Sequence, residues 1–444
     1  MSQLAPISTR WRLAAMALCA GAALAGAAEA RAGGFLIPKI GGDTAGPSVG
    51  GPAAIFWNPG AIGLIDGTIL LIDNNFFLRS ATFTRDTTGA GPDGQLFETA
   101  DLLALNAQPT LAITSDLDQQ KFTFGLGLYA PFGASSTWED PAGAQRFQSI
   151  FGGITSIYVS PTAAYSPSKD FHLGASVSYV RTSLTSYRAL DMGPLIAGFT
   201  GADVPPEQAG NEGRALLDFG GNAFAWSVGA AWNIDTVTLG LSYASEVDIT
   251  MKGKLGVFAP RNDFFQNLLG GDLDEPATLK TTWPRALRTG ATWWLDDKWT
   301  LSVNAEWVQW SLYDKIVVDV KNDNVAGLGN FDQEQINAWQ DTLGLRMGAR
   351  YSLSPDTMLF GGFGGESGAI PIKRLDPSIF DATKIGAAFG ASWKLSETTL
   401  FSVGYNHLFY LPAIVNETEV TPPPTGIHTQ QVGVLNTNLL WRLQ

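Results

Sequence analysis

Very few residues of this chain have the types and spacing that could do chemistry. Its three histidines, His172, His407 and His428, lie far apart, and none belongs with a serine or a carboxylate in the pattern of a catalytic nucleophile. The acidic residues within 272–275 suit a solvated loop better than a cation site, because they lack the ligand spacing of a metal centre. The glycines of residues 361–365 suit a bend in a strand better than a phosphate loop. The sequence therefore predicts no enzyme, no metal and no cofactor.

Binding is better represented than catalysis. Two long connections carry apolar side chains that an outward loop has no structural reason to expose, and such patches usually mark a ligand surface. We expect a hydrophobic ligand groove made of Leu195, Ile196, Phe199, Phe258, Phe264, Phe265, Leu268 and Leu269. The spacing within residues 264–269 suits a short amphipathic helix, and packing of these residues on one another as a loop core is the open alternative. If the ligand carries a carboxylate, the cations near strand ends that could hold it are Arg146, Arg181, Arg188 and Lys280.

The elements that must position these side chains are β-strands. From Thr68 to Leu443, apolar residues alternate with small or polar ones in runs of roughly ten, as in residues 121–129, 171–179, 223–233 and 300–307. Side chains alternate across a strand, so each run has one apolar face and one small or polar face. No convincing helical stretch is long enough to cover so large a sheet. A sheet without a covering layer must close on itself, which predicts a barrel.

The composition favours a membrane barrel over a soluble one. Charged residues make up 16% of the chain, and the 50 glycines suit the inner wall of a large barrel, which leaves the apolar face for lipid. Aromatic residues near the ends of the runs suit the girdles found at bilayer interfaces: Tyr129, Trp138, Trp232, Trp283, Trp293, Trp294, Trp299, Trp310, Trp393 and Trp441. A secreted β-sandwich is the alternative, but a soluble chain of this length would normally split into domains. We predict an all-β fold, a transmembrane antiparallel β-barrel of about 14 strands.

The N-terminus indicates the compartment. Arg10 and Arg12 precede an Ala- and Leu-rich core, and small-residue sites follow up to Ala32, which together predict a cleaved signal peptide over residues 1–32. The only cysteine, Cys19, lies in that segment, so no disulfide is expected. No later stretch has the roughly 18 consecutive apolar residues of a transmembrane helix. These features predict the outer membrane of a Gram-negative bacterium, and the net charge of −13 disfavours a nucleic-acid partner.

Residues 33–66 differ from the rest of the chain. This segment is rich in Gly and Pro and ends in an apolar cluster of Ile55, Phe56 and Trp57. Its length and apolar content suit a compact plug, or hatch, in the lumen of a barrel formed by residues 67–444. A disordered periplasmic tail is the alternative, but such a tail would not carry so apolar a cluster.

Four stretches of the chain resemble the FadL-type outer-membrane transporters of long-chain fatty acids and other hydrophobic compounds. They are Ala-Ile-Phe-Trp-Asn-Pro at residues 54–59, Gly-Leu-Tyr-Ala-Pro-Phe-Gly at 127–133 followed by Trp138 and Arg-Phe-Gln at 146–148, Leu-Ser-Tyr-Ala-Ser-Glu-Val at 241–247 followed by Lys-Gly at 252–253, and Trp-Pro at 283–284 leading to Gly290 and Trp307. Their order and spacing cover nearly the whole mature chain. Two departures are Gly60, where the family usually has Ala, and the absence of a terminal aromatic residue.

The resemblance implies a hatch that closes the lumen and moves to gate it. The residues concerned are Gly33, Gly34, Phe35, Asn58 and Pro59. It also implies a kink in the third strand that opens a lateral gap, through which the ligand would diffuse sideways into the membrane. The corresponding strand contains Gly125, Gly127 and Pro131, and a break in pairing is reasonable there because Pro cannot donate to the ladder and Gly tolerates bulges.

The predicted function is passive transport of hydrophobic molecules across the outer membrane, with long-chain fatty acids as the first candidate. Neutral aromatic hydrocarbons are the alternative ligand and would need no cation, whereas a general hydrophilic porin agrees less well with a plug and a low charge density. The expected partners are the hydrophobic ligand, outer-membrane lipid and lipopolysaccharide, and the barrel assembly machinery. A barrel with a lateral exit works as a monomer.

Overall fold

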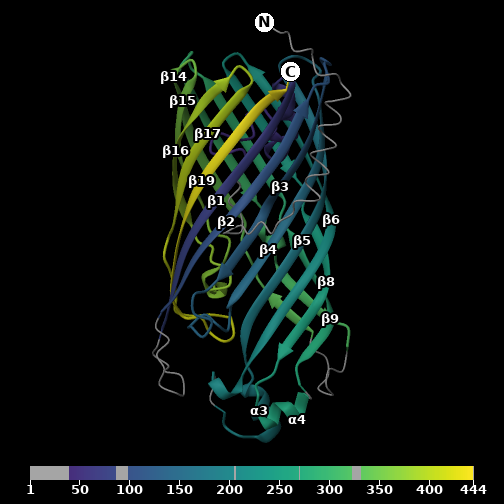
Figure 1. The fold of residues 1–444 in the computed structure, drawn as a ribbon, viewed down its shortest axis with the longest axis vertical. Helices are drawn as coiled ribbons and strands as arrows, with labels where there is room; N and C mark the ends of the chain where they lie inside the picture. Colours follow the sequence, from purple (N-terminus) through teal and green to yellow (C-terminus); the bar gives the residue numbers. More distant parts are fainter. Residues whose placement is uncertain (1–39, 87–98, 205–206, 270, 323–331, 444) are drawn as a thin grey trace.

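The structure is a computed structural model, and it describes residues 40–86, 99–204, 207–269, 271–322 and 332–443. One antiparallel sheet closes into a tall barrel, with the C-terminus at one end and two short helices beyond the other end (Figure 1). The predicted signal peptide at 1–32 and the predicted gate residues Gly33, Gly34 and Phe35 lie outside the described residues. Within the described part of the chain, no helix is long and apolar enough to cross a membrane.

The strands are β1 (Thr68–Arg85), β2 (Thr99–Ser115), β3 (Phe122–Thr137), β4 (Phe151–Tyr165), β5 (Phe171–Asp191), β6 (Glu212–Ile234), β7 (Val237–Ala244), β8 (Val247–Phe258), β9 (Leu273–Trp283), β10 (Ala286–Trp294), β11 (Trp299–Val308), β12 (Lys315–Val320), β13 (Gln333–Ile336), β14 (Thr342–Ser354), β15 (Thr357–Glu366), β16 (Lys384–Ser396), β17 (Thr399–Tyr410), β18 (Ala413–Val415) and β19 (Gly426–Leu443). The helices are α2 (Ala54–Trp57), α3 (Gly193–Thr200) and α4 (Asp263–Leu269), with 3-10 turns η1 (Pro59–Leu64), η2 (Ala209–Asn211), η3 (Trp310–Leu312) and η5 (Ile372–Arg374).

In the described residues, these segments make a closed wall of fourteen antiparallel strands. Five of the fourteen are each interrupted once, so that β7 and β8, β9 and β10, β11 and β12, β13 and β14, and β17 and β18 are halves of one strand. β1 pairs with β19 along its whole length and with β2 on its other side, which closes the wall. The predicted barrel of about 14 strands is confirmed.

The wall changes character part-way along the barrel. In β7, Leu239 and Leu241 point outward and are exposed, whereas in β8 the apolar Ile249 and Met251 are buried in the interior and Lys252 points outward. A one-residue slip moves every side chain of a strand to the other face, so the interruption between the halves transfers the apolar set from the outside to the lumen. In the half of the barrel nearer the C-terminus, the outer surface is therefore apolar and suited to lipid; we call it the lipid-faced half. In the half nearer α3 and α4, the outer surface is polar and suited to water; we call it the water-faced half.

The predicted aromatic girdles are partly correct. Six of the residues are exposed on the outer face: Trp232, Trp293, Trp294, Trp299, Trp393 and Trp441. The assignment is wrong for the other four, Tyr129, Trp138, Trp283 and Trp310, which are buried in the interior. Trp283 lies in β9, whose apolar residues point inward, and Trp310 lies in the turn η3 that interrupts a strand. The alternation within one run does not show whether the run lies before or after such an interruption. It therefore does not show whether the apolar side chains of the run point outward or inward.

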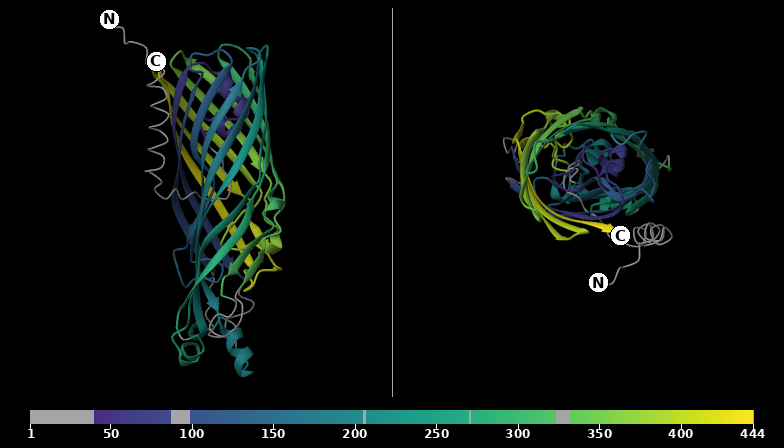
Figure 2. Two further views of the ribbon diagram at one scale, coloured as in Figure 1. Left: turned by 90° about the vertical axis from the view of Figure 1, so that its right-hand side faces the viewer. Right: turned by 90° about the horizontal axis from the view of Figure 1, so that it is seen from above.

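Residues 40–66 fold inside the barrel, as the view from above shows (Figure 2), and form the plug. Its residues Ile55, Trp57 and Ile62 are almost fully buried. Asn58 joins α2 to η1, because its Oδ1 accepts from the N–H of Gly60 at 3.0 Å and its Nδ2 donates to the carbonyls of Pro47 and Ala230 at 2.7 and 2.8 Å. The wall contributes glycines where it meets the plug backbone: a Cβ on Gly240 would lie 2.0 Å from the carbonyl oxygen of Pro47.

Candidate functional site

A cavity of about 590 Å³ lies inside the water-faced half of the barrel. The volume is within the range of small-molecule sites. Strands β3, β4 and β5 contribute to its wall on one side, β9, β12 and β13 on another, and residues within 370–379 and 419–421 complete it. The apolar residues that line it include Phe147, Ile154, Leu184, Leu217, Leu279, Ile316, Val318, Ile370 and Ile379. The arrangement can hold an apolar chain or ring away from water.

Two aromatic rings border this cavity on one side, and further rings stack behind them. Tyr313 and Trp339 line it, with their ring centroids 4.8 Å apart. Trp283 stacks on Tyr313 at 5.6 Å and 7°, and Phe132 stacks on Trp283 at 5.1 Å and 3°. Both separations are within the range of attractive aromatic pairs. We call the four rings Phe132, Trp283, Tyr313 and Trp339 the aromatic layer.

Further ring contacts join the aromatic layer to the plug. Phe132 contacts Tyr158 at 6.3 Å, Tyr158 contacts Tyr129 at 5.7 Å, and Tyr129 contacts Phe56 of α2 at 5.5 Å between centroids. Phe56, Tyr129 and Phe132 also line a second, smaller cavity of about 50 Å³. The aromatic layer thus separates the large cavity from the space next to the plug.

Arg188 supplies a cation to the large cavity. Among the described residues, no hydrogen bond or ion pair engages its side chain; the carboxyl of Asp376 acts on its charge through space. Burial raises the pKa of Asp376, although hydrogen bonds from Ser378 and the charge of Arg188 act in the opposite direction. A second cation of the lining, Arg374, is held by Glu419 at 2.5 Å. Arg188 is therefore free to meet an anionic group of a ligand.

The other three predicted carboxylate-binding cations are placed elsewhere. Arg146 is buried against Glu212, with Nε 2.9 Å from its carboxylate, and its guanidinium lies 4.3 Å from the ring centroid of Phe147. Arg181 and Lys280 are exposed on the outer face of β5 and β9, where they point away from the lumen. These two candidates therefore do not line the cavity, because the alternation of their strands turns them outward.

The predicted hydrophobic groove lies on and around the two short helices beyond the barrel end. Ile196 of α3 and Phe264 of α4 are partly buried against the core, and Phe265 is fully buried. Phe258, at the end of β8, is exposed at 38% and its ring lies 6.5 Å from that of Tyr187. The side chains of Leu195, Phe199, Leu268 and Leu269 lie outside the described residues. The expected helix at 264–269 is present as α4, and its phenylalanines pack largely inward.

The third strand, β3, is irregular after Leu128. It pairs with β2 from Phe124 to Leu128 and then follows β4 alone, with a register shift between Tyr129 and Phe132. The shift contains Ala130 and Pro131. Polar side chains cross the resulting gap to β2 and β1: Gln108 donates to the carbonyl of Ala130, Arg79 donates to the carbonyl of Ser135 at 2.9 Å, and Ser135 donates to Asn106 at 2.7 Å.

The two glycines predicted to form this kink do not lie in the irregular stretch. Gly125 and Gly127 are regularly paired with β2 and with β4. A Cβ on Gly125 would lie 2.9 Å from Cδ1 of Ile55, and a Cβ on Gly127 would lie 3.0 Å from Cγ2 of the same residue. The glycines therefore make room for the plug, whereas the irregular stretch begins two residues later.

Guanidinium groups of β10 and β14 hold the plug against the barrel wall. Arg288 lies 4.3 Å from the ring centroid of Phe56, donates to its carbonyl at 3.2 Å, and pairs with Glu306 at 2.6 Å. Arg346 lies 4.5 Å from the ring centroid of Trp57. Cation–π contacts of this kind contribute about 0.5–2 kcal/mol each. The plug is thus bound by several weak contacts rather than by one strong contact.

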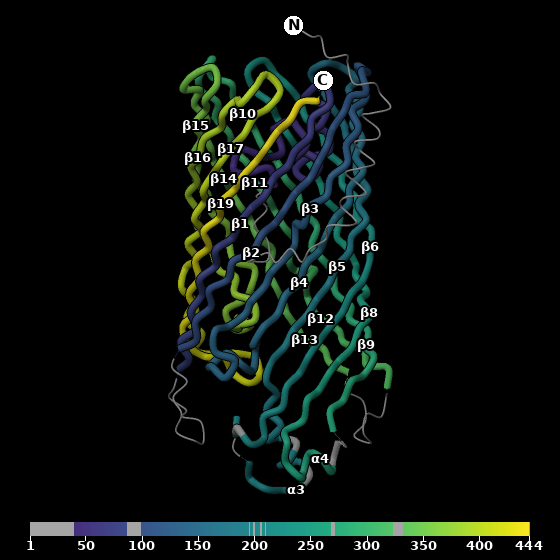
Figure 3. Tube along the Cα trace, in the orientation of Figure 1, coloured from purple at the N-terminus to yellow at the C-terminus, as the bar shows by residue number. Residues whose placement is uncertain are grey.

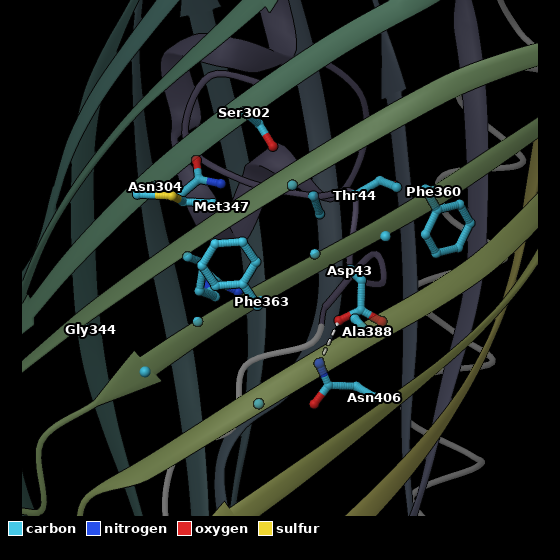
Figure 4. Close-up of a pocket in the computed structure, with 18 of the residues that line it drawn as sticks. Asp43, Thr44, Ser302, Asn304, Gly344, Met347, Phe360, Phe363, Ala388 and Asn406 are labelled. Carbon is cyan, nitrogen blue, oxygen red and sulfur yellow. Dashed lines mark hydrogen bonds between the residues drawn. The ribbon is translucent and has the colours of Figure 1, made fainter.

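A small cavity of about 100 Å³ lies between the plug and strands β11 and β14 to β17 (Figure 4). Asp43 and Thr44 face it from the plug, and Asn406 donates to Asp43 at 3.3 Å. The wall opposite is largely glycine, which leaves space for a few water molecules. Because of this space, the plug lies next to polar groups of the wall without filling the lumen.

Sequence reasoning missed the aromatic layer and the loop residues of the cavity. Tyr313, Trp339, Arg374 and Asp376 stand in connections, where they carry no strand periodicity. The available signal is composition: Trp339 is a large apolar residue, and such residues need burial. Within the described residues no group of three or more His, Cys, Asp and Glu is placed to hold a metal ion.

Comparison with solved structures identifies the fold. A FadL homologue from Pseudomonas aeruginosa superposes with a TM-score of 0.80 at 19% identity, covering 93% of this chain and 100% of its own. The toluene transporter TbuX of Ralstonia pickettii gives a TM-score of 0.64 at 17% identity, over 94% and 100% of the two chains. The toluene transporter TodX of P. putida gives 0.67 at 16% identity, over 93% and 98%. At these identities the likeness concerns the fold.

Comparison of sequences identifies the family. A protein of Neisseria meningitidis serogroup B, whose name assigns it to the outer membrane, is 23% identical over 377 residues, which are 80% of each chain. The family model of outer membrane protein transport proteins (OMPP1/FadL/TodX) matches residues 16–437. With its fourteen-stranded barrel and internal plug, the chain belongs to this family of outer-membrane transport proteins for hydrophobic compounds.

Proposed function

We propose that this protein carries long-chain fatty acids passively across the outer membrane, with Arg188 binding the carboxylate in the large cavity. The observation that carries the proposal is a cation without a bound partner among the described residues, set in a cavity of about 590 Å³ with an apolar lining. A fatty acid has the matching chemistry, an apolar chain with one terminal anion. Hydrogen bonds to a charged group contribute about 1.5–3 kcal/mol, so Arg188 would select for the carboxylate.

The path of the ligand follows from the cavities. It is captured from outside at the apolar residues of α3 and α4, and it then enters the large cavity. The next step displaces Phe132, which ends the register shift of β3 and belongs to the aromatic layer. The ligand leaves sideways between β2 and β3 once the side chains of Gln108 and Asn106 part from β3. Movement of the plug from Gly33, Gly34 and Phe35 onward gates this exit, and diffusion supplies the driving force.

Neutral aromatic hydrocarbons are the second candidate ligand. The specific observation in their favour is the aromatic layer, whose rings offer stacking surface to a flat ligand. Two of the solved relatives are toluene transporters, which agrees with this candidate. A hydrocarbon of this kind would bind without Arg188.

We also propose how the protein reaches the outer membrane and what surrounds it there. The signal peptide at 1–32 directs export, the barrel assembly machinery inserts the chain, and the protein functions as a monomer surrounded by lipid and lipopolysaccharide. No enzymatic step is part of the mechanism, and the proposed transport requires neither a metal nor a cofactor.

The test is uptake of labelled oleate and of labelled toluene by cells that lack their own fatty-acid transporter. We expect the protein to confer oleate uptake and Arg188→Gln to weaken its apparent affinity for oleate about tenfold to 100-fold. The matched control is Lys298→Gln, which removes the same charge from the exposed turn between β10 and β11. It should leave oleate uptake unchanged.

The two ligand classes give distinct outcomes. Toluene uptake without oleate uptake, insensitive to Arg188→Gln, would establish the aromatic candidate and reject the fatty acid. Oleate uptake that Arg188→Gln leaves unchanged, with the barrel folded in the membrane, would keep the fatty acid and reject the role of Arg188.

A further inference from the structure

Three cations form a row on the outer face of the barrel. Arg181 of β5, Lys252 of β8 and Lys280 of β9 are all exposed and point outward. β6 lies between the first two, and β5, β6, β8 and β9 are consecutive neighbours in the wall (Figure 3). Strands in a sheet are about 4.8 Å apart, so the row spans on the order of 15 Å between its outer backbones.

Register places the side chains of the row next to one another. Lys252 stands opposite Gly220 of β6, and the Arg181 guanidinium lies over Gly220, because a Cβ there would be 3.0 Å from its Nη2. Lys280 stands opposite Thr250, one diagonal step from Lys252 on the same face. Diagonal neighbours on one face are within reach of long side chains. Gly220 has no side chain, which gives the Arg181 guanidinium room to lie over this position, on the side of Lys252.

The row stands directly beyond the edge of the lipid-faced surface. On β5 the outward residues change from Tyr179 to Arg181, and on β6 from Phe224 to Asn222. Tyr179 and Phe224 contact each other with centroids 5.8 Å apart, and Trp226 contacts Tyr243 at 5.4 Å in the next positions. Aromatic pairs of this kind lie at the level where hydrocarbon meets headgroups. The cations are therefore at headgroup depth, on the half of the barrel that carries α3 and α4.

The three cations lack acidic partners in the part of the chain that the structure describes. Arg181 donates to Asn222 at 3.1 Å, and no ion pair engages Lys252 or Lys280. Four acidic residues share the outer face of these strands and of β12: Asp218, Asp248, Asp274 and Asp319. Asp248 accepts from Thr282 at 2.7 Å, and Asp274 lies 2.6 Å from the ammonium of Lys254. Asp218 and Asp319 stand one diagonal step from Lys252 and Lys280, and neither forms an ion pair with them in the described residues. The three cations of the row thus have no carboxylate within ion-pair distance in this part of the chain.

We propose that Arg181, Lys252 and Lys280 bind the phosphorylated headgroup of lipopolysaccharide in the outer leaflet. The argument is charge complementarity at the correct depth: phosphates are the anions of that leaflet, and the acyl chains of the same molecule would lie along the aromatic and aliphatic surface below. The long Lys and Arg stems keep their charged ends at the interface while their carbons cover apolar surface. The outward placement of Arg181 and Lys280, which excludes them from the lumen, gives them this role.

The experiment measures binding of bisphosphorylated lipid A to the purified full-length mature protein by native mass spectrometry or by titration in detergent. We expect the triple variant Arg181→Gln, Lys252→Gln, Lys280→Gln to bind it on the order of 100-fold more weakly, since each basic residue near an anionic leaflet contributes roughly equally. Each single variant should show a fraction of that loss. The matched control, Lys121→Gln, Lys169→Gln, Lys298→Gln, removes three exposed charges from turns at the other end of the barrel and should bind like the native protein.

Lipid A without phosphates is the second arm. It should bind the native protein and the triple variant equally weakly. Equal binding of bisphosphorylated lipid A to the native protein and to the folded triple variant would overturn the proposal. It would also be overturned by equal binding of the two forms of lipid A to the native protein, because acyl chains alone would then account for the contact. Oleate uptake does not enter this test, so its outcome is independent of the transport proposal.

Discussion

Arg188 and Asp376 are neighbouring charges in the proposed binding site. Both line the large cavity, one from β5 and the other from the connection between β15 and β16. Burial raises the pKa of Asp376, so its carboxyl takes up a proton at a higher pH than an exposed aspartate does. When Asp376 is charged it partly neutralises the field of Arg188, and when it is protonated the full positive charge faces the ligand.

We expect the affinity for a fatty-acid carboxylate to rise as the pH falls through the pKa of Asp376. The rise ends where the ligand carboxylate itself becomes protonated. Asp376→Asn should raise the affinity at neutral pH by about fivefold, because one charge at intermediate distance contributes about 1 kcal/mol, and it should remove the pH dependence. Titration with a fluorescent fatty acid across a pH series measures both effects.

Two controls accompany this measurement. Asp235→Asn lies in the turn between β6 and β7, where a positive φ of 50° suits Asn, and it should leave affinity and its pH dependence unchanged. A fatty alcohol of the same chain length should bind without pH dependence. If the alcohol shows the same rise as the acid, the pair of Arg188 and Asp376 is not its cause.

At the scale of elements, β3 departs from regular pairing at Ala130 and Pro131. Proline has no backbone N–H to donate to the ladder. When the strand leaves β2 at Pro131, no backbone hydrogen bond donated by that residue is lost. The glycines before it serve a different contact, because the plug residue Ile55 occupies the space where their side chains would be. Beyond the shift, β2 and β3 are joined by side chains such as Asn106 and Ser135 rather than by a backbone ladder.

A disulfide across this gap should block lateral release. The chain has one natural cysteine, Cys19, in the predicted signal peptide, so the pair Asn106→Cys and Ser135→Cys would be the only thiols of the mature protein. Their native side chains are hydrogen-bonded at 2.7 Å, which brings the two positions close enough to be tested for a bridge. We expect oleate uptake to stop on oxidation and to return on reduction.

The control for this pair joins two strands that are fully laddered. Asn74→Cys and Thr437→Cys stand opposite each other in β1 and β19, and their disulfide should leave uptake unchanged. Continued uptake by a quantitatively oxidised Asn106→Cys, Ser135→Cys protein would show that the ligand leaves by another path.

At the scale of the whole molecule, the barrel is wide enough to need its plug. Fourteen strands enclose a lumen that side chains of the wall alone do not fill, and residues 40–66 occupy the half faced for lipid. The plug is bound through Asn58, Arg288 and Arg346, by hydrogen bonds and ring contacts that are individually small. A transport protein for apolar ligands built in this way should be closed to ions.

We expect the native protein in planar bilayers to show little single-channel conductance, because the plug and the aromatic layer close the lumen. Deletion of residues 33–66 should open a large and steady conductance. Since such a deletion can impair folding, Arg288→Gln with Arg346→Gln is a milder second variant and should give brief openings. A native conductance equal to that of the deletion would reject a plugged transporter and favour a hydrophilic porin.

The barrel itself could be read from the sequence. Alternation with a period of two over runs of roughly ten residues demands strands, and a sheet without a covering layer must close. The apolar cluster at Ile55, Phe56 and Trp57 likewise indicated a segment that needs burial, and this segment lies in the lumen. These features are local: each depends on which residues follow one another, so no knowledge of distant neighbours is needed.

The site depended on the tertiary structure. Alternation along the uninterrupted β5 places Arg181 outward and Arg188 inward. Only closure of the barrel decided that Lys280 faces outward and that Trp283 belongs to the interior rather than to a girdle. The physical reason is parity: the short interruption between β9 and β10 exchanges the two faces of the strand, and the composition on either side of it is similar. Likewise, Tyr313 and Trp339 meet Trp283 and Phe132 across the lumen from connections and strands far apart in the chain. Contacts of that kind exist only after every strand has found its neighbours.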